Sequence, residues 1–76
     1  MNAQQILDSI ERLENQIADL NRDIAAETLL RNNAFNLELY EIANNMTIGI
    51  NKNKETLNRC VAQLGSLQGK SSLMWN

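Results

Sequence analysis

Several residue types are scarce or missing in this chain of 76 residues. It has no histidine and no proline, three glycines, one cysteine and 4% aromatic residues. Without histidine there is no imidazole general base and no histidine ligand for a metal. A single cysteine rules out a disulfide within the chain. Few glycines and no proline argue against a sheet or barrel, whose turns use these residues, and favour long helices.

Long apolar runs are also missing. No stretch approaches the roughly 18 apolar residues of a membrane span, and the amino end has neither a basic region nor the apolar segment of a signal peptide. We therefore expect a soluble, cytoplasmic protein with no membrane association. A chain this short usually needs a disulfide, a metal or oligomerisation to complete its core, and here oligomerisation is the option that remains.

The first third of the chain carries a narrow apolar stripe at alternating spacings of four and three residues. Its members form the predicted oligomer seam: Ile6, Ile10, Leu13, Ile17, Leu20 and Ile24. This heptad spacing is typical of a left-handed coiled coil, in which the stripe is buried against a partner helix. Isoleucine at position a with leucine at d favours a parallel dimer, but the number and orientation of the helices stay open.

The heptad is interrupted after Ile24, because its next two positions are Glu27 and Arg31. Apolar residues resume from Phe35 at similar spacing, eleven residues after Ile24, which predicts a stutter that unwinds the supercoil without ending the helix. A second apolar stripe accompanies this region. It predicts a further neighbour or a partner surface at Leu29, Leu30 and Leu37.

Gly49 is the most credible position for a turn. It stands between asparagine-rich segments, and glycine readily adopts the positive φ that ends a helix. The predicted organisation is a single domain with a helix over about 3–45, a turn over 46–52, a helix over about 53–68 and a tail over 69–76. Such a hairpin leaves the amino-terminal seam uncovered, which predicts an all-α, homo-oligomeric protein whose long first helix forms the coiled coil and whose second helix is shorter.

The residues with chemical potential form no recognisable catalytic, cofactor or metal site. Glu38 and Glu41 stand three apart, but carboxylate sites in helical bundles draw on several helices and normally include histidine. No glycine pattern suits a phosphate group. Cys60 lies on the apolar face of the second predicted helix and is expected to pack as a small buried residue. We therefore expect no cofactor and no enzymatic activity.

Two alternatives to an assembly or chaperone function stay open. The order of residue types over 41–64 suits a DNA-binding helix-turn-helix, with residues 51–63 as the reading segment. The spacing around Gly49 is longer than that motif uses, however, and three basic residues supply few phosphate contacts, so nucleic acid is not the favoured partner. The second alternative is a small protein inhibitor of an enzyme that binds through its acidic first helix.

The combination of Ile/Leu heptads, Glu41-Ile42-Ala43, Gly49-Ile50 and Glu55 followed by Leu57, Val61 and Leu64 resembles the small tail-fibre assembly chaperones of T-even-like phages. The likeness extends from about Ile10 to Leu67, with about two more residues between Ala43 and Gly49 than that family's turn has. It implies a homo-oligomeric chaperone that helps a fibrous client protein to assemble, without a cofactor or an enzymatic step.

Overall fold

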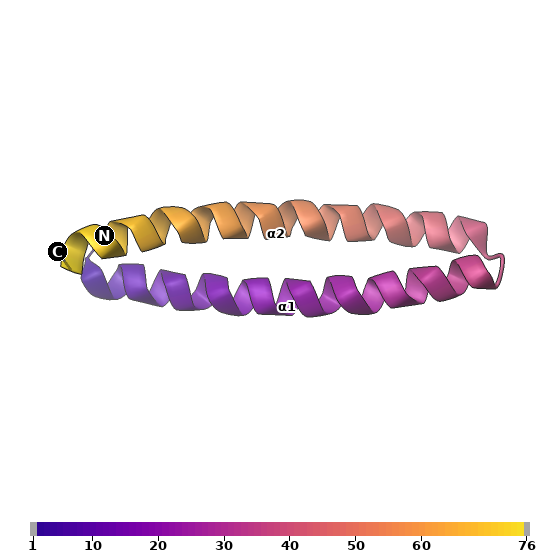
Figure 1. Ribbon diagram of the computed structural model, residues 1–76, viewed down its shortest axis with the longest axis horizontal. Coiled ribbons are helices and arrows are strands. Elements are labelled where there is room, and N and C mark those ends of the chain that lie inside the picture. Colours follow the sequence, from indigo (N-terminus) through magenta and orange to yellow (C-terminus); the bar gives the residue numbers. More distant parts are fainter. Residues whose placement is uncertain (1, 76) are drawn as a thin grey trace.

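The chain folds into two helices that run side by side in opposite directions (Figure 1). In this computed structural model, which describes the backbone of residues 2–75 and the side chains of residues 2–70, α1 spans Ala3–Asn36 and α2 spans Tyr40–Trp75. Over these residues there is no strand, and the molecule measures 56 × 16 × 14 Å. The expected all-α helical hairpin is confirmed.

A capping box starts α1. The Asn2 side-chain oxygen accepts a hydrogen bond from the Gln5 backbone N–H at 2.9 Å, and the Gln5 side chain accepts one from the Asn2 N–H at 3.1 Å. These bonds satisfy two backbone donors that would otherwise have no partner at the helix end. Asn2 therefore fixes where the first helix begins.

The turn between the helices is a Schellman motif built without glycine. The Leu39 N–H donates to the Ala34 carbonyl at 2.8 Å, and the Glu38 N–H donates to the Phe35 carbonyl at 3.0 Å. These are the two bonds that define the motif, whose residue at the Glu38 position is usually glycine. Glu38 has φ 61°, a left-handed conformation that costs an L-residue about 1–2 kcal/mol.

The position of this turn corrects the organisation predicted from the sequence. The chain reverses over residues 37–39, not 46–52, and Gly49 lies inside α2 with an ordinary helical conformation. The backbone is also helical through Trp75, so the predicted tail over 69–76 is wrong up to that residue, while residue 76 and the side chains after 70 lie outside the described part. The physical reason is burial. A turn at 46–52 would remove Ile50, which is fully buried, from the interface between the helices.

Because α2 is as long as α1, it packs along the whole length of the predicted seam and buries one side of it. Buried or half-buried side chains recur at three and four residues along both helices. On α1 they are Ile6, Ile10, Leu13, Ile17, Leu20, Ile24, Glu27, Arg31 and Ala34, and on α2 they are Ala43, Met46, Ile50, Asn53, Leu57, Cys60, Leu64 and Leu67. The prediction that the seam is left unpaired within one chain is therefore wrong.

The predicted stutter is also absent, because Glu27 and Arg31 continue the heptad as polar members of the interface. The Asn53 side-chain N–H group donates to both carboxylate oxygens of Glu27, at 3.1 and 3.2 Å. Glu27 thereby finds a partner on the opposite helix. Arg31 Nε is buried without a hydrogen-bond partner among the described residues. We call these three residues the polar layer.

Candidate functional site

Exposed apolar side chains gather at the end of the hairpin where the chain turns. Ten large apolar residues of the described side chains are exposed, and seven of them fall within residues 29–42. These seven form what we call the turn-end surface: Leu29, Leu30, Phe35, Leu37, Leu39, Tyr40 and Ile42. Single exposed apolar residues are common on soluble proteins, so it is their concentration at one end of the hairpin that makes this end the candidate site.

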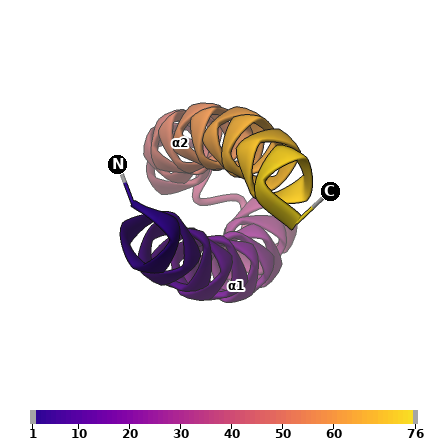
Figure 2. The same ribbon diagram turned by 90° about the vertical axis from the view of Figure 1, so that its left-hand side faces the viewer.

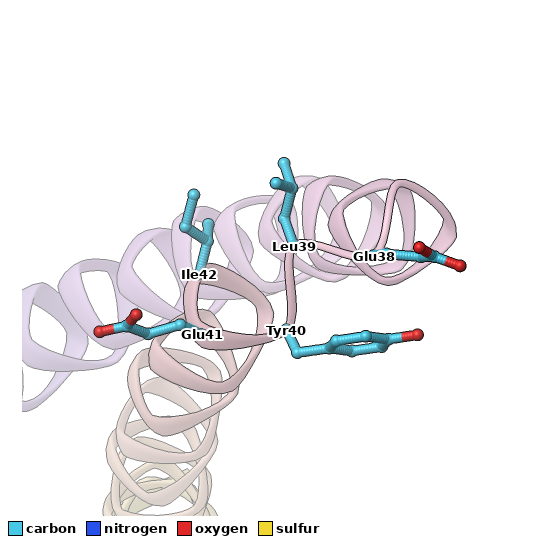
Figure 3. Close-up of a pocket in the computed structure, with 5 residues that line it drawn as sticks. All are labelled: Glu38, Leu39, Tyr40, Glu41 and Ile42. Atoms are coloured by element: carbon cyan, nitrogen blue, oxygen red, sulfur yellow. The ribbon is translucent and has the colours of Figure 1, made fainter.

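The shape of this surface follows from the tight turn. Residues 38–42 line a shallow hollow of about 380 Å³. Within it the Leu39 and Ile42 side chains point the same way, next to each other, and form a short apolar ridge (Figure 3). Leu39 is 46% and Ile42 is 53% exposed. The turn thus holds two aliphatic side chains outward on a fixed backbone.

An aromatic pair supports the other side of the turn. The rings of Phe35 and Tyr40 have their centroids 6.3 Å apart at an interplanar angle of 51°. This tilted arrangement is one that aromatic pairs favour. Because Phe35 lies in the last turn of α1 and Tyr40 begins α2, the pair connects the two helix ends across the turn.

The charge near the turn is negative. Glu38 and Glu41 are the charged residues of the segment 32–51, which contains no lysine or arginine. Figure 3 shows their carboxylates reaching to opposite sides of the ridge formed by Leu39 and Ile42. Neither carboxylate bonds to another described side chain; the ion pair found among these residues joins Arg22 and Asp19 at 2.9 Å, on α1.

The structure places the predicted site residues in two groups. Ile6 and Leu13 are buried between the helices, and the other seam residues are half-buried there. Leu29, Leu30 and Leu37 are 63%, 57% and 70% exposed and belong to the turn-end surface. Gly49, predicted as the turn, contributes to neither group. Sequence reasoning missed Leu39, Tyr40 and Ile42, because it treated this segment as the inside of a helix.

Further features of the described residues lie away from the turn. The Cys60 thiol is buried and lies 3.9 Å from the Gln16 side-chain oxygen on the facing helix. A second shallow hollow, of about 260 Å³, lies between Ser9 and Leu67 near the chain ends. Over the described residues, no three acidic, cysteine or histidine side chains come together as a metal site would need. In the same part of the chain, neither helix has a stretch apolar enough to cross a membrane.

The helix-turn-helix interpretation of residues 41–64 is wrong, because these residues lie in one uninterrupted helix. Comparison with protein-family models, with characterised proteins and with solved structures found no match to this chain. The geometry of the hairpin and its surface is therefore the basis for a functional proposal.

Proposed function

We propose that this chain is a non-enzymatic, homo-oligomeric assembly factor that binds a client protein through its turn-end surface. The observation that supports this is the concentration of exposed apolar side chains at the turn, where Leu37 is 70% exposed. Interfaces between proteins depend on a few apolar or aromatic anchors near their centre. The resemblance to tail-fibre assembly chaperones points to a helical or fibrous client.

Because α2 packs along the seam, a second chain is not needed to pair with it, but part of the seam is left open to one. Two helices cover each other on one side only. Ile10, Ile17, Leu20 and Ile24 accordingly stay half-exposed, and six apolar residues are buried among the described side chains. A second hairpin packed against this flank would extend the heptads into a four-helix coiled coil and bury these side chains.

Enzyme inhibition is a second protein-binding function, and it would use a different surface. The acidic residues Glu11 and Glu14 lie on the exposed face of α1, far from the turn. The position of a bound protein on the hairpin therefore distinguishes an assembly factor from an enzyme inhibitor.

Photo-crosslinking from defined positions tests the proposal. A photoreactive amino acid replaces Leu37 in the turn-end surface, Glu11 on the acidic face of α1, or Ala62 on the exposed side of α2 as a control. We expect the variant at position 37, but not the control, to crosslink to one client, which is identified and purified. The double variant Leu30→Ser/Leu37→Ser should then lose binding to that client while light scattering gives an unchanged oligomer mass.

Two results would count against the proposal. Crosslinks from position 37 to other copies of the same chain, together with a reduced mass of the serine variant, would assign these residues to the oligomer core. Crosslinks to an enzyme from position 11, with none from position 37, would favour the inhibitor.

A further inference from the structure

The ridge at the turn has a chemical character beyond being apolar. Leu39 and Ile42 form its crest, and the carboxylates of Glu38 and Glu41 stand on its two sides (Figure 3). Interfaces commonly have this arrangement, with apolar anchors in the middle and polar groups around them. The side chains that surround the ridge are therefore as informative about a partner as the ridge itself.

One of the two glutamates has no evident role within the hairpin. Glu41 lies in the first turn of α2, where the helix dipole favours a negative charge. Glu38 occupies a left-handed backbone position at φ 61°, which glycine would adopt without strain. The backbone hydrogen bonds of the Schellman motif require this conformation but not a glutamate side chain. The Glu38 carboxylate bonds to no described side chain, so nothing within this part of the chain favours glutamate over glycine at this position. Strained residues that persist in this way are concentrated at binding sites.

The geometry points to a basic amphipathic helix as the partner of the turn-end surface. In such a helix an apolar stripe would lie along Leu39 and Ile42, and lysine or arginine on both borders would reach Glu38 and Glu41. This inference rests on the proposed function, because it names the chemistry of the client that the surface binds. Recognition of an amphipathic helix by an apolar surface is a common mode of peptide binding.

The charges disfavour the other occupants. If two copies met turn to turn, both pairs of glutamates would come together, and like charges at an interface oppose association. An anionic membrane surface would repel the same carboxylates. With no lysine or arginine between residues 32 and 51, nothing at the turn would offset this repulsion.

Two labelled helical peptides test the inference by fluorescence anisotropy. Both have the same leucine stripe, which is bordered by lysine in one peptide and by glutamate in the other. We expect the full chain to bind the leucine–lysine peptide more tightly. The variant Glu38→Gln/Glu41→Gln should bind it about three- to tenfold more weakly, as expected for two ion pairs at an interface rim. The affinity of this variant should also fall less steeply as salt is raised.

A matched control separates local charge from net charge. Glu11→Gln/Glu14→Gln removes two exposed carboxylates from α1 far from the turn and should bind the leucine–lysine peptide as the unmodified chain does. Leu39→Ser/Ile42→Ser should abolish binding of both peptides. Circular dichroism confirms that each variant stays helical.

The outcomes distinguish this inference from the proposed function. If the variant at residues 38 and 41 binds like the control, the inference is overturned, while loss of binding in the serine variant still supports an apolar client surface. If the serine variant binds both peptides normally, the turn-end surface is not the binding site and both ideas fail. If Leu39→Ser/Ile42→Ser lowers the oligomer mass in light scattering, a second copy occupies the ridge, which also overturns the inference.

Discussion

The alternating burial of α2 gives a sharp prediction for two isoleucines that stand two residues apart. Ile50 is fully buried against α1, whereas Ile48 is 56% exposed on the outer side of the same helix. Replacing a buried isoleucine by alanine removes its transfer free energy and leaves a cavity, so Ile50→Ala should lower the free energy of unfolding by about 2–5 kcal/mol. Ile48→Ala should change it by no more than about 0.5 kcal/mol, since it loses little buried area and alanine favours a helix.

Urea denaturation followed by circular dichroism measures both effects. A small hairpin has little stability to lose, so Ile50→Ala could prevent folding altogether. Ile50→Val covers that case, because it should cost about 0.5–1.5 kcal/mol and leave a measurable transition. Equal effects of the alanine variants at 48 and 50 would show that this segment is not a helix packed on one face. Such a result would favour the turn at residues 46–52 that the sequence predicts.

Two other positions give independent tests of the hairpin. Gly49→Ala should raise the free energy of unfolding by about 0.5–1 kcal/mol, because Gly49 lies inside a helix and a Cβ there would meet no atom within 4 Å; a loss of stability in urea denaturation would contradict the helical assignment. Replacing Glu27 and Asn53 by alanine, singly and together, should give a coupling energy of about 1.5–3 kcal/mol in a double-mutant cycle, as expected for a hydrogen bond to a charged group. Additive effects would mean that the two side chains do not bond in solution.

The heptads of the first helix could be predicted from the sequence as far as Ile24, because every position there is apolar. Beyond it the pattern continues in space, but Glu27 and Arg31 occupy its next positions. Charged residues at these positions indicate a break in the heptad pattern unless their hydrogen-bond partner is known. The partner of Glu27 is Asn53, which lies 26 residues further along the chain. Hydropathy alone therefore could not distinguish an interruption of the stripe from a polar layer within it.

The turn was missed for a related reason. Sequence reasoning looks for glycine where a helix must end with positive φ, and Gly49 satisfied that expectation. The actual turn places glutamate in this conformation, at Glu38. The position of the turn is determined by the pairing of apolar positions along two long helices, which is a property of the whole hairpin. The exposure of Leu39, Tyr40 and Ile42 follows from the position of the turn. Because that position was not predicted, most of the turn-end surface could not be predicted either.

The direction in which the hairpin opens under force follows from the placement of its ends. The start of α1 and the end of α2 lie together opposite the turn (Figure 1), and the end-on view in Figure 2 shows no other element between them. A pulling force applied between the termini would therefore separate the helices one layer after another, and would not shear all layers at once. Ile6 and Leu13 would part first, the pair formed by Glu27 and Asn53 later, and Ala34 and Ala43 beside the turn last. The turn end would thus keep its shape after the other end has been peeled apart.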